Sequence, residues 1–485
     1  MILKKKNKGP DSEEKGFFIT TSIAYTNASP HLGFALELIQ ADVLARYHRI
    51  LGEKVFFLTG TDEHGQKIAK ASEEAGKNPE EFTDEISGKY KKLKESLNLS
   101  NDDFIRTTDQ KRHWPAVEKV WLGLEENGDI CKKKYKGFYC VGCEAFITNK
   151  DLAAGKCKIH QKEPEIIEEE NYFFKLSKYS KEIGEAIEKD KIKITPEGRK
   201  NEMLSFIGQG LEDVSFSRPR KDLKWGIPVP GDESQTIYVW ADALVNYLSA
   251  LGYPDDNFKK FWPPDVHCLG KDILRFHATI WLGMLLSLKL PLPKNIFVHG
   301  FITSNGQKMS KSLGNVVDPF ELVKKYGTDP VRYFLLREIT STEDGDFTYE
   351  KFEQRYTSDL AKGLGNLVSR VATLAKKYSL PSDVFAKGQV KKEISAVQEK
   401  YQKALSDLKF NEALISVWEL IGFCDRYIEK EKPWEGKENA KEVIVDLLST
   451  IKEIARLLEP FLPQTSKEVA EQLKSEKIKA LFPRI

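Results

Sequence analysis

Apolar and polar positions follow two different periods in the N-terminal part of the chain. The run GFFITTSIAY (residues 16–25) is apolar and rich in β-branched and aromatic residues, which predicts a strand. Beyond the turn ASPHLGF, apolar residues recur at helical spacing, at Leu32, Leu36, Ile39, Val43 and Tyr47. KVFFLTG (residues 54–60) is a second short apolar run and ends in the polar loop TDEHG. Alternating strands and helices are typical of a parallel sheet.

The same pattern returns after residue 230. TIYVWADAL, DVHCLGKDILRFH and KNIFVHGFITS each predict a strand with polar residues just past its end. In an open α/β sheet, ligands bind beyond the carboxyl ends of the strands. We therefore expect these polar loops to converge on one crevice.

Two changes of composition divide the chain. From about 126 to 230, cysteines, lysines and glutamates become frequent, which predicts an insertion that splits the sheet domain. After about residue 355 no strand is predicted, and SDLAKGLGNLVSRVATLAKKY and KEVIVDLLSTIKEIARLL show the 3.6-residue period of a helix bundle.

Length and charge narrow the class of protein. With 485 residues, 40% of them apolar, the chain is long enough for several domains. The longest apolar run, ATIWLGMLLSL (278–288), is too short to span a membrane and predicts a buried helix. The N-terminus has no apolar core of a signal peptide, so we expect a cytoplasmic protein, although an organellar origin stays open. A net charge of +2 argues against a protein that coats nucleic acid.

CVGC (140–143) and CKIH (157–160) form two short-spaced ligand pairs joined by a loop. Such pairs suit tetrahedral zinc, because each turn places two ligands on one side of the ion. The predicted ligands are Cys140, Cys143, Cys157 and His160. Three thiolates and one imidazole leave no coordination position for water, so the predicted role is structural.

Two basic segments suit a polyphosphate. His31 lies at the predicted strand-to-helix turn, where helix N-terminal amides favour an anion, although a histidine there is often only a cap. KMSKS (308–312) lies between Gly306 and Gly314; a lysine-rich loop of this kind is by itself usually solvated surface. Together the two segments offer donors on both sides of a triphosphate.

These features occur together, and in order, in one family. SIAYTNASPHLG, FLTGTDEHGQK, YCVGCEAF, NYFFKLSKY, YVWADAL, GKDILRFH, FITSNGQKMSKSLGNVVDP and KPWE follow one another along the chain. The set resembles the methionyl-tRNA synthetases over nearly the whole length. These are class I aminoacyl-tRNA synthetases with the signatures H-I-G-H and K-M-S-K-S, and the zinc spacing resembles their single-knuckle form.

The resemblance implies an α/β fold: a Rossmann-type parallel sheet split by a zinc-containing insertion, followed by a C-terminal α-helical bundle. The implied domains are the first half of the catalytic domain at 1–125, the insertion at 126–230, the second half at 231–302, the KMSKS loop and stem-contact region at 303–355, and the anticodon-binding bundle at 356–485.

The resemblance also implies the reaction. Methionine and ATP give methionyl-adenylate, and the amino acid then passes to the 3′-terminal ribose of tRNA(Met). The substrate's own carboxylate attacks, so the protein positions the reactants and stabilises charge. The implied catalytic residues are His31, Lys308 and Lys311, assisted by Mg2+. ATP would be bound by these three with Gly33, Phe34 and Asp272.

For methionine, the resemblance implies Asp62 as the partner of the α-ammonium group. Aromatic contacts with the sulfur are worth about 0.3–1.5 kcal/mol each, although any single aromatic residue of this set would otherwise be taken as ordinary core. Trp240 and Tyr25 are expected at strand ends that face the crevice. The implied pocket consists of Ile23, Tyr25, Asp62, Trp240, Ala243, Leu244, Tyr247, Ile273 and His277.

In the bundle, Asn366 and Arg370 lie four residues apart and Trp434 follows Pro433 at an expected helix start. From the residues alone these are a surface ion pair and a packed indole, whereas the resemblance implies contacts with the anticodon. The chain ends soon after the bundle, so we expect a monomer.

Two other interpretations deserve comparison. A synthetase for leucine, isoleucine or valine would carry a large editing domain, for which the insertion leaves no room. A catalytically weakened tRNA-binding paralogue is the alternative function. Its support is Phe34, which replaces the second histidine of H-I-G-H.

Overall fold

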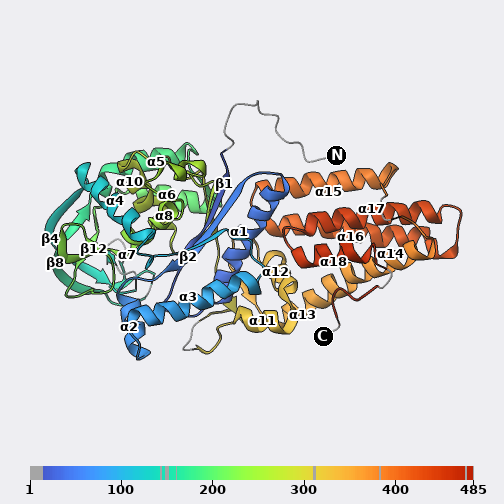
Figure 1. Cartoon of the computed structure of the whole chain (residues 1–485), viewed down its shortest axis with the longest axis horizontal. Coiled ribbons are helices and arrows are strands. Elements are labelled where there is room, and N and C mark those ends of the chain that lie inside the picture. The colour runs from blue at the N-terminus through green and yellow to red at the C-terminus, as the bar shows by residue number, and fades with distance from the viewer. Residues whose placement is uncertain are drawn as a thin grey trace. The chain divides into compact units, whose positions relative to one another are not determined.

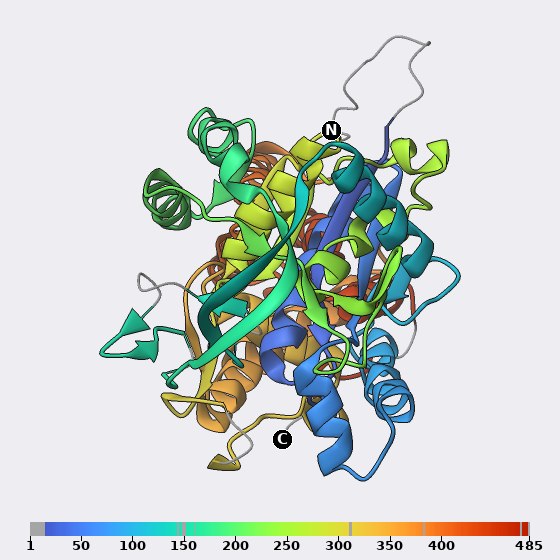
Figure 2. The same cartoon turned by 90° about the vertical axis from the view of Figure 1, so that its left-hand side faces the viewer.

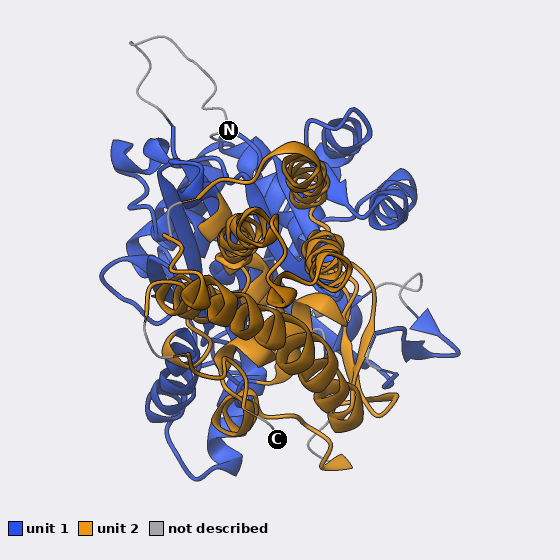
Figure 3. Cartoon of the chain, turned by 90° about the vertical axis from the view of Figure 1, so that its right-hand side faces the viewer, with its two compact units in different colours: residues 1–30, 48–94, 100–298 blue, residues 31–47, 95–99, 299–485 orange. Residues whose placement is uncertain are grey.

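The computed structural model describes residues 15–142, 145–147, 152–159, 161–309, 313–381, 384–475 and 478–483. The chain divides into two compact units, coloured blue and orange in Figure 3. Unit 1 contains residues 1–30, 48–94 and 100–298, and unit 2 contains residues 31–47, 95–99 and 299–485.

Unit 1 is built on a six-stranded sheet in the order β3-β2-β1-β14-β15-β9. Its strand pairs β3–β2, β2–β1, β1–β14 and β15–β9 are parallel, which confirms the predicted sheet. The strands are β1 (Phe17–Tyr25), β2 (Val55–Asp62), β3 (Asp103–Arg106), β9 (Lys193–Thr195), β14 (Val266–Gly270) and β15 (Asn295–His299).

The order of the strands reverses at β1, and the end of this strand is where a ligand is expected to bind. The chain leaves β1 for β2 on one side of it, while β14 pairs on its other side, and ligands bind at such a reversal. Tyr25, the last residue of β1, is the register partner of Asp62, the last residue of β2. The strand ends predicted to bind substrate therefore lie side by side.

Helices of unit 1 cover the sheet, whose residues Phe18, Leu58, Ile105 and Ile296 join one apolar core with the helices. These helices are α2 (Gln66–Glu74), α3 (Pro79–Ser96), α4 (His113–Glu126), η2 (Leu176–Tyr179), α5 (Ser180–Glu188), α6 (Glu197–Gly208), α7 (Val239–Ala243), α8 (Asn246–Ser249), η3 (Asp256–Lys260), α9 (Leu274–Phe276), η4 (His277–Trp281) and α10 (Leu282–Ser287). The buried helix predicted for 278–288 is confirmed as η4 and α10.

The predicted strand TIYVWADAL is wrong in part. The strand β13 (Asp232–Ile237) ends before Tyr238 and belongs to a separate antiparallel sheet with β11 (Ser217–Pro219) and β12 (Pro228–Val229). After Tyr238 the chain turns into α7, so Trp240 lies on a helix rather than at a strand end. A short apolar run has the same appearance in a strand and in a buried helix, which explains the error.

The insertion folds around a long antiparallel pair, β4 (Ile130–Cys140) and β8 (Glu165–Phe174), which crosses the front of Figure 2. β5 (Ala145–Ile147) and β10 (Val214–Ser215) extend this sheet on its two sides, and β6 (Leu152–Ala153) pairs with β7 (Lys156–Cys157). β9, which also falls within 126–230, joins the main sheet instead.

Unit 2 combines the first four turns of the long helix α1 (Leu32–Ile50) with the C-terminal part of the chain. The helices α14 to α18 run side by side as the predicted bundle (Figure 1). Besides α1, the elements of unit 2 are β16 (Ile302–Ser304), β17 (Gln307–Lys308), α11 (Pro319–Tyr326), α12 (Thr328–Arg337), β18 (Gly345–Phe347), α13 (Tyr349–Arg355), η6 (Tyr356–Gly365), α14 (Asn366–Lys377), α15 (Gly388–Ser406), α16 (Phe410–Glu431), η7 (Pro433–Glu435), α17 (Ala440–Leu458) and α18 (Pro463–Gln472).

A buried ion pair ties α1 to the rest of unit 2. Arg332 and Asp42 are both fully buried, with Nη2 and Oδ2 2.8 Å apart. Arg332 also donates to the carbonyl oxygens of Leu97, Pro460 and Phe461, so all parts of its guanidinium are hydrogen-bonded. Such full pairing is what a charge in a protein interior requires. In the part of the chain that the structure describes, no helix has both the length and the apolarity needed to cross a membrane.

Candidate active site and tRNA-binding residues

The TDEHG loop that carries Asp62 is fixed by its neighbour Glu63. The Glu63 carboxylate is fully buried and accepts two hydrogen bonds of 2.7 Å from the Arg106 guanidinium. The hydroxyls of Thr61 and Thr108 each donate to it at 2.5 Å. A carboxylate with four donors holds its backbone rigidly, which fixes where the half-buried Asp62 lies. Sequence reasoning missed Glu63, whose half-buried partner Arg106 ends the neighbouring strand β3.

An aromatic group gathers next to this loop. Trp240 stacks on Phe276 with ring centroids 3.9 Å apart and an interplanar angle of 6°, and its edge meets His277 at 6.1 Å. The Tyr247 hydroxyl lies 2.8 Å from His277 Nε2. Tyr247 is 1% exposed and His277 is 2% exposed, so the hydrogen bond between them is dry.

The hydrogen bonds assign the protonation of this group. His277 Nδ1 lies 3.1 Å from the Ile273 carbonyl oxygen, which only accepts, so Nδ1 carries a hydrogen. In the tautomer with its hydrogen on Nδ1, Nε2 accepts the hydrogen bond from the Tyr247 hydroxyl. His277 also begins η4, a π-helical turn, and such turns often occur at functional sites.

A second imidazole, that of His267, contacts the Tyr247 ring. His267 packs against the Tyr247 ring at 4.3 Å and is 1% exposed. The Trp281 indole donates to its Nε2 at 3.3 Å, so its Nδ1 donates to the Thr20 hydroxyl at 2.6 Å. Burial holds the pKa of His267 well below its ordinary value, and the ring is neutral.

Most residues predicted for methionine therefore belong to one region of unit 1. Its apolar core contains Leu244 and Tyr247 as buried members. Four more of these residues pack against the core as partly buried members: Ile23, Tyr25, Trp240 and Ile273. Ala243 lies on α7 and is buried. Asp272, predicted for the ribose, lies exposed between β14 and α9.

The residues predicted for the phosphates lie in unit 2. His31 is exposed immediately before α1, and its Nδ1 accepts from the Gly33 amide at 3.1 Å. A Cβ at Gly33 would lie 3.0 Å from His31 Cε1, so the glycine leaves room for this imidazole. Phe34 is half-buried in the first turn of α1.

Lys308 is displayed by a hairpin rather than by the expected loop. β16 and β17 pair Thr303 with Lys308, and the connecting Asn305 and Gly306 both have positive φ, 52° and 72°. This is the conformation that an Asn-Gly hairpin turn adopts. Lys308 is exposed at the end of β17, with its ammonium 5.8 Å from the centroid of the Phe301 ring. Lys311 lies outside the described residues.

Two of the four predicted zinc ligands are described. Cys140 ends β4 and Cys157 ends β7, and both are buried in one small cluster with Ile147. This arrangement fits the predicted site, since each of the two ligand pairs contributes one thiol to the cluster. Cys143 and His160 lie outside the described residues, and within the described ranges no group of three potential ligands occurs. The zinc site stays a prediction.

The residues predicted for the anticodon lie at one end of α14 and at η7. Asn366 and Arg370 lie on the first turns of α14, and Arg370 Cζ lies 4.7 Å from the centroid of the Trp434 ring. Arg370 also forms an ion pair of 2.7 Å with Glu429. Trp434 is 37% exposed, which leaves part of its ring accessible.

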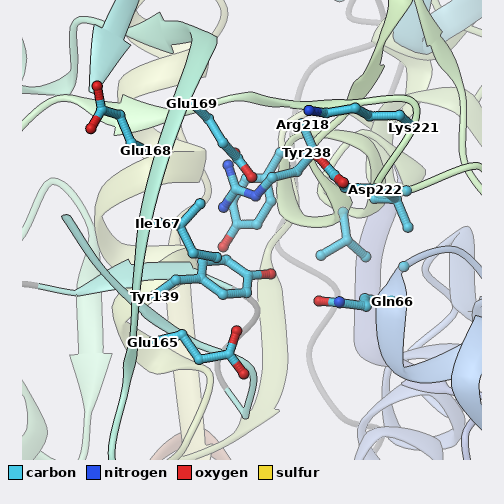
Figure 4. A pocket seen from close by; sticks show the side chains of 13 residues that line it. Gln66, Tyr139, Glu165, Ile167, Glu168, Glu169, Arg218, Lys221, Asp222 and Tyr238 are labelled. Carbon is cyan, nitrogen blue, oxygen red and sulfur yellow. The ribbon is translucent and has the colours of Figure 1, made fainter. Parts of the chain in front are cut away.

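Sequence reasoning also missed Arg218. Its guanidinium lies between aromatic rings, 4.9 Å from the centroid of Tyr139 and 5.4 Å from that of Tyr238, and the residue is 6% exposed. Nη1 donates to Ser215 and to the Ser217 carbonyl, but Nε and Nη2 have no hydrogen-bond partner among the described residues. Arg218 lines a cavity of about 300 Å³ that reaches Gly65, next to the TDEHG loop (Figure 4). The lining of this cavity carries charges of both signs, since Glu165, Glu169 and Asp222 also belong to it, and the spare donors of Arg218 are suited to an anionic group.

Comparisons with known proteins agree with this arrangement. The model of the family described as "tRNA synthetases class I (M)" matches residues 17–152 and 147–372, and that of the "anticodon-binding domain of tRNA ligase" matches residues 389–484.

Among curated relatives, the methionine–tRNA ligase of Thermotoga maritima is 44% identical over 95% of this chain and 75% of its own length. That of a Nostoc species is 42% identical over 95% of this chain and 90% of its own length. A solved structure of Mycobacterium tuberculosis methionyl-tRNA synthetase in complex with methionyl-adenylate superposes with a TM-score of 0.90. It is 34% identical and covers 97% of this chain and 100% of that one. The chain belongs to the methionyl-tRNA synthetase family of class I aminoacyl-tRNA synthetases.

Proposed function

We propose that this chain is a methionine–tRNA ligase that activates methionine with ATP and transfers it to the 3′-terminal ribose of tRNA(Met). The observation that carries the proposal is the group of aromatic side chains beside the TDEHG loop in unit 1. Tyr25, the sheet neighbour of Asp62, belongs to the same apolar core as Trp240 and Tyr247. A carboxylate beside an aromatic enclosure suits an amino acid with a free ammonium group and a flexible thioether.

In the proposed site, Asp62 pairs with the α-ammonium and the aromatic group encloses the side chain. The remaining contacts are those implied for Ile23, Ala243, Leu244, Ile273 and His277. Arg218 offers two spare donors to the negative charge of the substrate or of the adenylate. The fixed TDEHG loop supports this assignment, because pre-positioned charges need no rearrangement during the reaction.

Activation then needs no side-chain nucleophile. The methionine carboxylate attacks the α-phosphorus of ATP, pyrophosphate leaves, and methionyl-adenylate forms. His31, Lys308 and Lys311 stabilise the charge on the phosphate oxygens, Gly33 and Phe34 lie beside the nucleotide, and Asp272 accepts from the ribose hydroxyls. Mg2+ bound with ATP would neutralise further phosphate charge.

We assign zinc and tRNA to two different sets of residues. Cys140, Cys143, Cys157 and His160 would hold one structural zinc ion, which the shared burial of Cys140 and Cys157 supports. Asn366, Arg370 and Trp434 would contact the anticodon, with the exposed part of the indole available for stacking on a base. We propose that the protein acts as a monomer in the cytoplasm.

The proposal is tested by exchange of labelled pyrophosphate into ATP. Exchange is expected with methionine and not with leucine, isoleucine or valine. Asp62→Ala is expected to lower kcat/KM for methionine by at least about 30-fold, since losing one partner of a desolvated charge pair costs about 2–5 kcal/mol. Wild-type protein with full zinc occupancy and bound tRNA, but without exchange, would instead be the tRNA-binding paralogue.

The second step has its own control. Trp434→Ala removes a base-stacking surface worth about 1–3 kcal/mol, so charging of tRNA(Met) is expected to weaken by about 5- to 150-fold. Methionine-dependent exchange should be unchanged in the same variant, because it does not involve tRNA. Equal loss in both assays would contradict the anticodon role of Trp434.

A further inference from the structure

Asp242 lies in the interior of unit 1 between two imidazole rings. Its Oδ2 is 2.7 Å from His64 Nδ1, and its Oδ1 is 2.7 Å from His113 Nε2. Asp242 and His113 are 0% exposed and His64 is 2% exposed. A carboxylate only accepts hydrogen bonds, so both of these ring nitrogens carry a hydrogen. Both oxygens of Asp242 are thus used in directional contacts.

The carboxylate is ionised in this environment. Burial alone would raise the pKa of Asp242, but its interaction with His64 and the hydrogen bonds from His113 and His64 lower it. A buried ionised group must keep its partners, because leaving it unpaired is strongly unfavourable. The cluster therefore resists any movement that separates its three members.

Two members of the cluster lie within two residues of a group proposed to hold methionine, and the third is hydrogen-bonded to a residue that does. His64 follows Asp62 in the TDEHG loop, and Asp242 lies between Trp240 and Ala243 on α7. His113 Nδ1 continues the network to the Ser249 hydroxyl at 2.9 Å, two residues beyond Tyr247. The hydrogen bonds thus connect the loop that would bind the ammonium group with the helices that would enclose the side chain.

The helices concerned are too short to orient themselves. α7 has five residues and α8 has four, and isolated helices of this length do not form in water. Their orientation is therefore set by tertiary contacts. Apolar packing is not directional, whereas a carboxylate held by two imidazoles fixes both the distance and the rotation of α7.

We propose that His64, Asp242 and His113 are positioning residues that fix the distance between the ammonium-binding carboxylate and the aromatic enclosure, and so determine which side-chain length the enzyme accepts. This inference rests on the proposed function. It assigns the cluster no contact with substrate.

The test compares a variant that removes a donor with one that keeps it. His64→Leu removes the hydrogen bond, whereas His64→Asn places an amide nitrogen close to the position of Nδ1. For His64→Leu we expect the methionine KM to rise at least about 10-fold, with the ATP KM within about twofold of wild type. The preference for methionine over its S-ethyl analogue should fall at least about fivefold. His64→Asn should recover most of both effects.

A merely structural role would produce a different pattern. His64→Leu and His64→Asn would then lower thermal stability without separating the two KM values or changing the preference between the analogues, and this result would overturn the proposal. If His64→Leu does not fold, Ser249→Ala provides the same comparison. That variant removes the outer hydrogen bond to His113, together with a longer one of 3.3 Å to the Asn246 carbonyl oxygen, and should raise the methionine KM about threefold, leaving the ATP KM unchanged.

Hydrogen exchange separates this inference from the proposed function. In His64→Leu or Ser249→Ala, amides of residues 60–66 and 238–249 should exchange faster together, while those of β1 stay as in the wild type. A wild-type protein without methionine-dependent pyrophosphate exchange would refute the proposed function, yet faster hydrogen exchange of both segments in the variants would still show that the cluster positions them. If the wild type activates methionine but hydrogen exchange in the variants equals that of the wild type, the inference alone is overturned.

Discussion

Tyr247 and His277, proposed for the amino acid, are 1% and 2% exposed, whereas His31 and Lys308, proposed for the phosphates, lie on the surface of their unit. The first pair is joined by a hydrogen bond of 2.8 Å inside the apolar core of unit 1. The second pair consists of an imidazole before a helix and an ammonium on a hairpin. One region is assembled before any substrate binds, and the other presents its charges to water.

The difference follows from the two ligands. A thioether makes few directional contacts, so it can be selected only by the shape of a dry pocket whose walls are already fixed. A triphosphate is strongly hydrated and needs cations that stay ionised, which burial without partners would oppose. Changes among the residues proposed for the amino acid should therefore alter the methionine KM and the selectivity. Changes among the residues proposed for the phosphates should alter kcat.

The largest effect is expected for His31→Ala. A donor that acts mainly on the developing charge contributes about 2.7–4 kcal/mol, so kcat for pyrophosphate exchange should fall about 100- to 1,000-fold. The methionine KM should stay within about threefold of wild type, because none of the pocket contacts in unit 1 changes.

A matched control for this variant is His48→Ala, which removes another histidine of α1. His48 stacks on Phe17 with ring centroids 3.6 Å apart and belongs to unit 1. It should lower stability without a comparable change in kcat. A rise in methionine KM for His31→Ala, with kcat unaltered, would remove the distinction between the two regions.

Tyr247→Phe tests the other region. The change removes the hydroxyl that donates to His277 Nε2 and leaves a buried acceptor without its partner, which costs about 1–3 kcal/mol. The methionine KM should rise about 5- to 150-fold, while the ATP KM stays the same. Tyr253→Phe is the control, because that ring packs against Phe258 and is not among the residues proposed for methionine.

The sequence predicted the framework of both regions but not the contacts that fix them. Periodicity located β1, α1 and β2, because each is a local pattern with one buried face or run. It failed at TIYVWADAL, where only the pairing of β13 in a separate sheet decides that the strand ends before Tyr238. The edge strand β9 lies within the predicted insertion for the same reason, since strand pairing is a property of the folded chain.

The candidate site shows the same limit at the level of single residues. Asp62 and His31 stand in motifs, so their positions could be named before the fold was known. Glu63 stands beside Asp62 in TDEHG and Asp242 stands in YVWADAL, yet the importance of Glu63 depends on Arg106, and that of Asp242 on His64 and His113, all from other parts of the chain. Arg218 lies in no motif used in the prediction, and only its burial beside a cavity identifies it.

His267 gives a prediction for pH. Because the folded pKa lies well below the ordinary value of about 6.5, the unfolded chain binds a proton there that the folded chain does not. Folding stability should therefore fall as pH drops below about 6.5, by up to about 1.4 kcal/mol per pH unit from this group. His267→Gln should reduce this slope in urea unfolding between about pH 6.5 and 5. An equal slope in both proteins would mean that the His267 imidazole is not held neutral in the folded chain.

The smallest effect is expected for Phe34→His, which restores the second histidine of the family signature. Phe34 is half-buried in the first turn of α1, next to the exposed His31, so a histidine there would add one donor at a helix N-terminus that already favours anions. Because His31 and the loop lysines already supply donors, kcat for exchange should change by less than about fivefold, well below the effect of His31→Ala.

Single-turnover adenylate formation measures this step directly, with Phe34→Leu as the control for loss of the ring alone. A rise of about 100-fold in Phe34→His would show that the phosphate residues of this chain are incomplete as they stand. The surface region would then be the one that limits the reaction, and the dry pocket would serve only to select the amino acid.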